Sequence, residues 1–175
     1  MEHINLVDPQ IYFTKEFLKM VDEFEKAGEM RSEYERARLD FSAFIGWLQN
    51  QSRGIGLPSG MVPMNTFWLV RDEATILGEV RLRHHLTPAL EVEGGHIGYM
   101  IRPSERRKGY GTLQLKLALE KVRLLGLPRV MVTCDADNTG SYRIIEKNGG
   151  VMIGKAVSPY SGKPILHYWI ELTLD

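Results

Sequence analysis

The chain has 175 residues, of which 43% are hydrophobic, and its 22 basic and 22 acidic side chains cancel to a formal net charge of zero. This length and hydrophobic content suit one domain with a sizeable core. Balanced charge excludes a molecule-wide attraction to nucleic acid or to an anionic membrane, so a bound anion needs a local patch. No segment reaches the roughly 20 apolar residues of a membrane span, and the first residues lack the pattern of a signal peptide. A single cysteine, Cys134, cannot form an internal disulfide. We therefore expect a soluble, cytoplasmic protein.

The first third of the chain is predicted to be helical. Residues 14–29 and residues 40–51 each repeat apolar side chains three or four positions apart, which is the spacing of one helical face. A loop is expected over residues 52–63. The apolar side chains of the two helical faces are Phe17, Met20, Val21, Phe24, Phe41, Phe44, Ile45 and Leu48.

From residue 65 onward, strands dominate the pattern. Apolar runs rich in β-branched residues predict strands, and apolar stripes that end at a glycine, such as Gly126, predict helices. The expected strands are residues 65–72, 75–86, 94–103, 129–135, 151–157 and 164–172, and the expected helices are residues 111–126 and 139–150. The last two strands form a terminal hairpin.

This order of elements indicates one α/β (α+β) domain over residues 1–175, in which helices flank a single mixed, mostly antiparallel sheet. Within that domain we expect three parts. They are N-terminal helices and a loop over residues 1–60, a core over residues 66–150, and a C-terminal hairpin over residues 151–175.

The most informative stretch is RPSERRKGYGT, residues 102–112, which lies between an expected strand and an expected helix. Its spacing is R-x-x-G-x-G, with Arg106, Gly109 and Gly111 at the fixed positions. Glycine lets the backbone approach a ligand closely, and a helix N-terminus presents free N–H groups with a partial positive charge. The stretch therefore predicts a phosphate or pyrophosphate site, with an ordinary solvated basic turn as the alternative.

Two blocks of the sequence resemble the GNAT superfamily of acyl-coenzyme A dependent N-acyltransferases. The block HIGYMIRPSERRKGYGTLQLKLALEKV, residues 96–122, is similar to the strand, pyrophosphate loop and helix of that family, and DADNTGSYRIIEKNGG, residues 135–150, to its Asn-x-x-[Ala/Ser] helix. The likeness is specific from about Phe67 to Gly150. It implies a GNAT-like fold and an enzyme that moves an acetyl group from acetyl-CoA to a primary amine, by direct attack in a ternary complex and without a metal.

The resemblance also implies which residues bind the cofactor. The strand before the loop lends main-chain groups to the pantetheine arm and the acyl carbonyl, and the loop amides receive the pyrophosphate. Asn138 bonds the pantetheine or a structural water, with a helix cap as its alternative role. The residues assigned to the cofactor in this way are Met100, Ile101, Arg102, Arg106, Arg107, Lys108, Gly109, Tyr110, Gly111, Thr112, Asn138 and Ser141.

Acyl transfer needs a base for the amine and a proton for the departing thiolate. His96 stands where many members of the family carry a glutamate and is the first candidate base, with Glu79 second and a purely structural histidine as the alternative. Ile145 occupies the position of the family's usual tyrosine acid and cannot donate a proton. Tyr142, one helical turn earlier, is a candidate substitute. Ser141, water and unassisted departure of the thiolate also remain open.

Other readings of the sequence are less well supported. A coenzyme A binding module without catalysis is the main alternative, because of Ile145. A nucleic-acid binding domain is disfavoured by zero net charge, and a metal site at His84, His85 and Cys134 lacks paired ligand spacing. Cys134 lies in a strand pattern without a base nearby, so we expect it in the core rather than as an acyl carrier.

The acceptor amine is not identified by the sequence. A small polyamine, an amino acid, an antibiotic and a protein N-terminus all fit a primary amine. We expect it to contact the N-terminal helices, the loop over residues 52–63 and the terminal hairpin. A homodimer is kept as an alternative to a monomer, because the hairpin has a mixed face that can pair with a second subunit. That face consists of Ile165, His167, Trp169 and Glu171.

Overall fold

The structure is a computed structural model and describes residues 2–172. Seven strands, six α-helices and two short 3-10 helices alternate along this part of the chain. The strands are β1 (Ile4–Val7), β2 (Met64–Arg71), β3 (Thr75–Arg83), β4 (Ile97–Ile101), β5 (Arg129–Asp135), β6 (Val151–Val157) and β7 (Pro164–Glu171). The helices are α1 (Thr14–Lys26), α2 (Tyr34–Leu39), α3 (Phe41–Ser52), α4 (Pro88–Val92), α5 (Tyr110–Leu124) and α6 (Thr139–Lys147), with η1 (Ile11–Phe13) and η2 (Pro103–Glu105).

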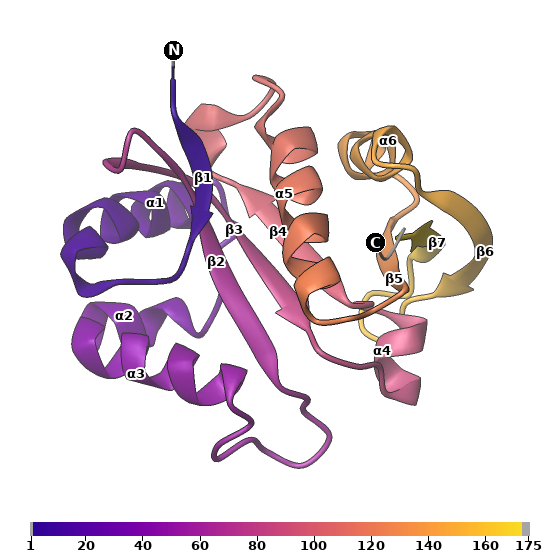
Figure 1. Cartoon of the computed structure of the whole chain (residues 1–175), viewed down its shortest axis with the longest axis horizontal. Coiled ribbons are helices and arrows are strands. Elements are labelled where there is room, and N and C mark those ends of the chain that lie inside the picture. Colours follow the sequence, from indigo (N-terminus) through magenta and orange to yellow (C-terminus); the bar gives the residue numbers. More distant parts are fainter. Residues whose placement is uncertain (1, 173–175) are drawn as a thin grey trace.

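The first sheet has four antiparallel strands in the order β1-β2-β3-β4. Helices α1, α2 and α3 cover one face, and α5 covers the other (Figure 1). Successive side chains of β2 point to opposite faces, so Trp68 packs among the aromatic side chains of α1 and α3 while Leu69 packs against α5. Burial on both faces explains the continuous apolar run of this strand.

The second sheet is antiparallel with the order β5-β7-β6, and α6 lies beside it (Figure 1). The two sheets meet where β4 begins. The amide of His96 donates to the carbonyl of Met131 at 2.8 Å, and the amide of Met131 donates to Nδ1 of His96 at 2.9 Å. Gly95 makes this approach feasible, because a Cβ there would lie 2.5 Å from the Met131 oxygen. Within residues 2–172, β4 and β5 are not paired as neighbouring strands of one sheet.

The expected fold class is confirmed, and the strands and helices predicted from residue 65 onward are present within a few residues. The strands form two antiparallel sheets rather than a single one, because β4 and β5 meet only at the His96 joint. Three short elements, β1, α2 and α4, were not predicted. The division into three parts stays a prediction.

The predicted edge of the terminal hairpin needs a correction. Strand β7 lies in the middle of the second sheet, between β5 and β6, so its backbone is paired on both sides. Ile165, expected on an exposed face, is buried. The edge strand is β6, which exposes Val151, Met152 and Ile153. The homodimer stays a prediction.

None of the helices within residues 2–172 has the length and apolar character needed to span a membrane.

Candidate active site

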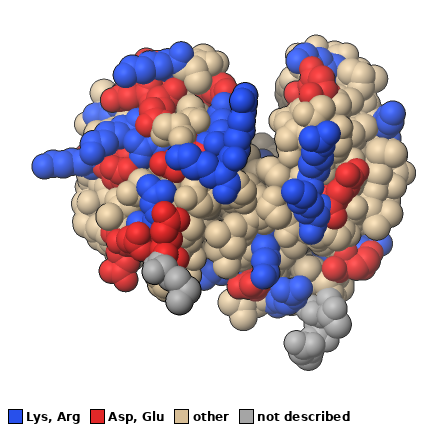
Figure 2. Space-filling model, turned by 90° about the horizontal axis from the view of Figure 1, so that it is seen from above, with Lys and Arg blue, Asp and Glu red and all other residues tan. Residues whose placement is uncertain are grey.

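A hollow separates the part of the molecule that carries α1 and the first sheet from the part that carries α6 and the second sheet, with Lys and Arg side chains on both sides of it (Figure 2). A cavity of about 670 Å³, here called the larger cavity, is lined by the end of β4, the loop before α5 and the start of α6. This volume lies in the range of small-molecule and cofactor sites. Residues far apart in the sequence thus build one concave site.

The loop before α5 presents its main chain to the larger cavity. Arg107 and Gly109 adopt the left-handed conformation, with φ of 62° and 86°. This conformation is uncommon for a residue other than glycine. Among the described residues, the amides of Arg107, Lys108 and Gly109 donate to no acceptor, and the first amides of α5 have no partner within the helix. The loop therefore has the features of an anion site at a helix N-terminus.

Ten of the twelve residues assigned to the cofactor line this cavity. Arg102 does not, because its side chain crosses to α1, where it bonds Glu16 at 2.5 Å and Glu23 at 2.8 Å. Lys108 bonds Glu105 at 2.9 Å and also lies outside the lining. The ten lining residues are Met100, Ile101, Arg106, Arg107, Gly109, Tyr110, Gly111, Thr112, Asn138 and Ser141.

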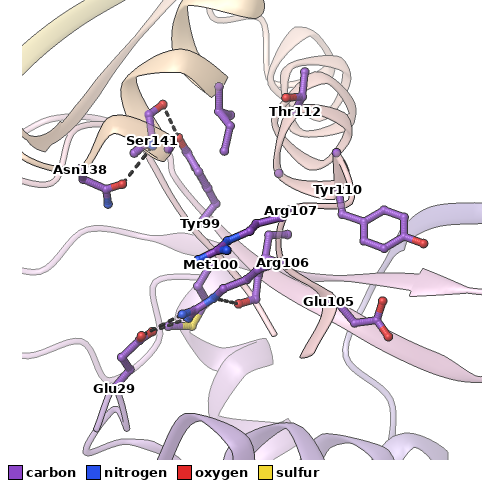
Figure 3. A pocket seen from close by; sticks show the side chains of 15 residues that line it. Glu29, Tyr99, Met100, Glu105, Arg106, Arg107, Tyr110, Thr112, Asn138 and Ser141 are labelled. Carbon is purple, nitrogen blue, oxygen red and sulfur yellow. Dashed lines mark hydrogen bonds and ion pairs between the residues drawn. The ribbon is translucent and has the colours of Figure 1, made fainter. Parts of the chain in front are cut away.

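Arg106 is bound to a carboxylate at the mouth of the larger cavity. Both terminal nitrogens of its guanidinium donate to the Glu29 carboxylate, and its Nε donates to the carbonyl of Ile101 at 3.1 Å (Figure 3). The hydrogen bond from Arg106 lowers the pKa of Glu29 below its usual range. Arg106 is therefore held in place by a partner 77 residues away in the sequence.

The start of α6 forms the opposite wall. Asn138 is the N-cap, and its side chain accepts a hydrogen bond from the Ser141 amide at 3.0 Å, as the helix-cap interpretation predicted. The Tyr99 hydroxyl lies 2.8 Å from Ser141 Oγ (Figure 3) and donates to the Ser141 carbonyl at 3.2 Å. Burial raises the pKa of Tyr99 well above its usual value, so the hydroxyl stays protonated at neutral pH.

A second cavity of about 280 Å³, here called the smaller cavity, shares part of its wall with the larger one. Tyr99, Asn138 and Ser141 line both. The smaller cavity is bounded by β4, β5 and the loop before α2, and its charged lining residues are Arg31, Arg83, Glu93 and Asp135. The loop over residues 52–63, which we expected near the acceptor, contributes nothing to this lining.

His96, the first candidate base, sits at the joint between the sheets and lines neither cavity. Its Nδ1 accepts the hydrogen bond from the Met131 amide, its ring lies 6.2 Å from that of Trp169, and only 7% of its surface is exposed. Burial, with a smaller contribution from the charge of Arg83, lowers the pKa of His96 to about 4. This environment favours the structural alternative for His96.

Glu79, the second candidate base, is enclosed beneath α1 and α2. It is 1% exposed and accepts hydrogen bonds from Tyr34 at 3.1 Å, Trp68 at 3.3 Å and Arg81 at 2.9 Å. Both of its carboxylate oxygens are therefore occupied, and it lines neither cavity. The contacts indicate that Glu79 anchors the N-terminal helices to β3.

Tyr142, the candidate acid, is partly buried against the core and does not line either cavity. Ile145 is fully buried in the same core. The side of α6 that faces the larger cavity instead carries Ser141 and Ile144, three positions apart.

The predicted core position of Cys134 is observed, because its thiol is buried and borders the smaller cavity. Burial raises the pKa of the Cys134 thiol to about 11. A thiol in this state contributes little thiolate at neutral pH, which disfavours a covalent acyl-enzyme. Within residues 2–172, no group of three or more His, Cys, Asp or Glu side chains is arranged to hold a metal ion.

Five lining residues of the larger cavity were missed from the sequence. Tyr99, Glu105, Gly140 and Ile144 lie inside the two recognised blocks, where a reading of each whole block would include them. Glu29 had no signal, because it reaches the site only through Arg106. The five residues are Glu29, Tyr99, Glu105, Gly140 and Ile144.

Comparison with known proteins gives a consistent result. A family model described as an acetyltransferase (GNAT) domain matches residues 16–151. No curated protein matches the sequence. RimJ of Mycobacterium smegmatis, in complex with a CoA disulfide, has a similar structure, with a TM-score of 0.72, 16% identity, and coverage of 96% of this chain and 81% of that chain.

Two further solved structures show the same likeness. RimL, a ribosomal protein α-N-acetyltransferase in complex with coenzyme A, has a TM-score of 0.70 and 14% identity, with 98% of this chain and 96% of that chain covered. The self-immunity acetyltransferase MccE, in complex with acetyl-CoA and AMP, has a TM-score of 0.65 and 14% identity, with 97% and 92% covered. At these identities the structural likeness shows the fold.

Proposed function

This chain belongs to the GNAT acetyltransferase family, and from that premise we propose that it transfers an acetyl group from acetyl-CoA to a primary amine in a ternary complex. The observation that carries the proposal is the shared wall of the two cavities. Tyr99, Asn138 and Ser141 line both, so a thioester in the larger cavity and an amine in the smaller cavity can meet there. Holding both reactants in one site converts their encounter into a unimolecular step.

The residues of the larger cavity fit coenzyme A. The unpaired amides from Arg107 to Gly109 and the N-terminus of α5 suit its pyrophosphate, because such donors are fixed before the ligand arrives. The main chain of β4 at Met100 and Ile101 borders the cavity beside them and suits the pantetheine arm. When bound, acetyl-CoA supplies the activated thioester.

We assign the proton for the thiolate to Tyr99 and Ser141 in place of Tyr142. The Tyr99 hydroxyl is protonated, lies at the shared wall and contacts Ser141 Oγ at 2.8 Å. The predicted donor Tyr142 is partly buried against the core and lines neither cavity. A hydroxyl from β4 thereby supplies what Ile145 on α6 cannot.

We assign removal of the amine proton to the carboxylate side of the smaller cavity and to water. Asp135 and Glu93 line that cavity, whereas His96 and Glu79 are enclosed and hydrogen-bonded to other residues. A carboxylate binds the ammonium form of the acceptor. The ammonium proton can then pass through the carboxylate to solvent before the neutral amine attacks the thioester. On this assignment, His96 and Glu79 stabilise the site rather than exchange protons in it.

The proposal is tested by measuring free thiol released from acetyl-CoA in the presence of pooled primary amines. With an accepted amine, Tyr99→Phe is expected to lower kcat about 100-fold, as is typical for loss of a general acid, without changing the affinity for acetyl-CoA. Tyr142→Phe is the matched control and is expected to keep kcat within about twofold.

Two results would contradict this scheme. Equal losses in the Tyr99 and Tyr142 variants would show that neither hydroxyl acts specifically on the leaving group. Binding of acetyl-CoA without turnover of any amine would support the alternative of a noncatalytic coenzyme A binding module.

A further inference from the structure

The smaller cavity contains a guanidinium that lacks a carboxylate partner. Nη1 of Arg83 donates to the carbonyls of Gly94 and Gly95 at 3.0 and 3.1 Å, and no carboxylate of the described residues lies within ion-pair distance. These two bonds occupy one of its three nitrogens, while the side chain borders the cavity. Arg83 therefore keeps donors available for a ligand.

This arrangement contrasts with the other enclosed arginines of the chain. Arg81, two positions earlier on β3, pairs with Glu79 and Glu33. Arg102 pairs with Glu16 and Glu23. An enclosed cation without an anion is costly, so pairing is the normal solution. Arg83 has no such pairing, and it lies at the wall of a cavity.

Neighbouring positive charges further raise the free energy of the charged Arg83 side chain. Burial, followed by the positive charges of Arg81 and Arg31, lowers the pKa of Arg83 to about 10. Arg31 lines the same cavity, and its nearest carboxylate, Glu33, is 3.7 Å away and already bound by Arg81. A negative group placed between Arg83 and Arg31 would relieve this repulsion.

Carboxylates also line the smaller cavity. The Asp135 side chain forms no hydrogen bond or ion pair with any residue that the structure describes, and Asp135 ends the strand that leads to Asn138 at the shared wall. Glu93 is bound by the Ser158 hydroxyl at 2.6 Å. The cavity thus offers a carboxylate for an ammonium group and a guanidinium for an anion.

We propose that the acceptor is a primary amine that also carries a carboxylate, with its carboxylate bound by Arg83 and Arg31 and its amine bound beside Asp135. This inference rests on the proposed acetyl transfer and deepens it by naming the acceptor class. A volume of about 280 Å³ suits a molecule of the size of an amino acid, or the first residue of a peptide. A free amino acid and an acidic N-terminal residue share this chemistry.

The test compares pairs of acceptors of which one member carries the carboxylate and the other the corresponding amide. Free amino acids are assayed against the corresponding amino acid amides, and short peptide amides that begin with Asp or Glu against those that begin with Asn or Gln. We expect the wild-type protein to prefer the carboxylate member in one of these two series by about 10- to 100-fold in kcat/KM, the usual value of a charge-assisted contact. The series with the preference identifies the source of the carboxylate.

The variant Arg83→Gln is expected to remove this preference by lowering kcat/KM more for the carboxylate member than for the neutral member. The Kd for coenzyme A, which is proposed to bind in the larger cavity, is expected to stay within about threefold. Because Arg83 also binds two carbonyls before β4, Arg31→Gln serves as a second variant that leaves those bonds intact. It is expected to reduce the preference in the same direction.

Equal use of the charged and neutral members by the wild-type protein would overturn the inference while leaving acetyl transfer standing. A preference that survives in both variants would also overturn it. If acetyl-CoA binds but no amine is acetylated, the proposed function fails. The inference is then decided by calorimetric titration of the same amine pairs into the protein with coenzyme A, where equal Kd values for acid and amide would refute it.

Discussion

The two cavities are lined by different kinds of groups, and this difference decides how visible each is in the sequence. The larger cavity presents main-chain donors of one loop and one helix N-terminus, from residues 102–112. The smaller cavity presents charged side chains separated by about 100 residues, from Arg31 to Asp135. Main-chain recognition leaves a local pattern of glycines and charges, whereas a side-chain site assembled by the fold leaves none.

The joint at His96 lies where the two sheets that carry these cavities meet. The largest expected effect is on stability. The variant His96→Ala removes the acceptor of the buried Met131 amide and leaves a void, and we expect it to lower the free energy of unfolding by about 2–4 kcal/mol. The variant His96→Asn keeps an acceptor and is expected to lose less. Urea unfolding at pH 7 measures both.

The same joint predicts a pH dependence. In the folded protein the pKa of His96 is lowered to about 4, so the unfolded chain binds the proton more readily. The stabilisation is complete above a pH of about 6.5, the unfolded pKa, and is lost as the pH falls towards 4. This shift corresponds to about 3 kcal/mol, and the advantage of wild type over His96→Asn is expected to shrink by that order across this window.

An unchanged gap between these two proteins from pH 6.5 to pH 4 would contradict the structural role. A stable His96→Asn protein that acetylates its amine about 100-fold more slowly would instead restore His96 as the base.

The third prediction tests the main-chain donors of the loop at Gly109. Its φ of 86° disfavours any other residue, yet a Cβ there would meet no atom within 4 Å. The variant Gly109→Ala therefore strains the backbone by about 1–2 kcal/mol without a clash. As the loop relaxes, its amides shift, and we expect the Kd for coenzyme A to rise about tenfold in calorimetry.

Gly126 offers a matched control at the other end of α5, with φ of 72° and equally open space. Gly126→Ala is expected to cost similar stability without weakening coenzyme A binding. Equal Kd values for the two variants would refute the loop as the pyrophosphate site. Gly111→Val is a poorer test, because its Cβ would lie 2.5 Å from Cδ1 of Ile144, so that the Ile144 side chain in the cavity wall must also shift.

The sequence predicted the parts of the molecule that depend on local constraints. Long strands and the α5 and α6 helices carry strong periodicity, and the loop carries its own motif. The short β1 has only four residues and gains its stability from pairing with β2, so no local pattern indicates it. Likewise, the enclosure of Glu79 depends on Tyr34 and Trp68, which only the tertiary fold brings together.

The catalytic predictions depend on the same tertiary information. The residue type of His96 and its position before the loop make it a candidate base, but the usefulness of a base depends on which side chains surround it. Tyr99, the proposed acid, lies three positions further along, and its local sequence does not single it out. Only the tertiary fold places its hydroxyl next to Ser141. The residue type shows which side chains can donate a proton, and the geometry shows which of them lie close enough to do so.

The smallest expected effect concerns the contact between Arg106 and Glu29 at the larger cavity. Arg106 is bound to Glu29 in the structure, so the pyrophosphate must compete with a carboxylate for it. The pKa of Glu29 is lowered by that bond, so it stays charged at neutral pH, and its contribution to stability is lost only as the pH falls through the lowered pKa. The variant Glu29→Gln removes this competitor and its repulsion of the ligand. We expect coenzyme A to bind about two- to fivefold more tightly, the scale of an exposed ion pair.

A double-mutant cycle makes this small effect interpretable. It compares the wild type, Glu29→Gln, Arg106→Gln and the double variant. If Glu29 acts only by competing for Arg106, then Glu29→Gln is expected to improve binding in the wild type and to have little effect in an Arg106→Gln background. The improvement is also expected to shrink at high salt, because the contact is partly exposed. Weaker binding in Glu29→Gln would mean that the ion pair holds the loop in its binding shape, and that the larger cavity depends on a distant side chain as the smaller one does.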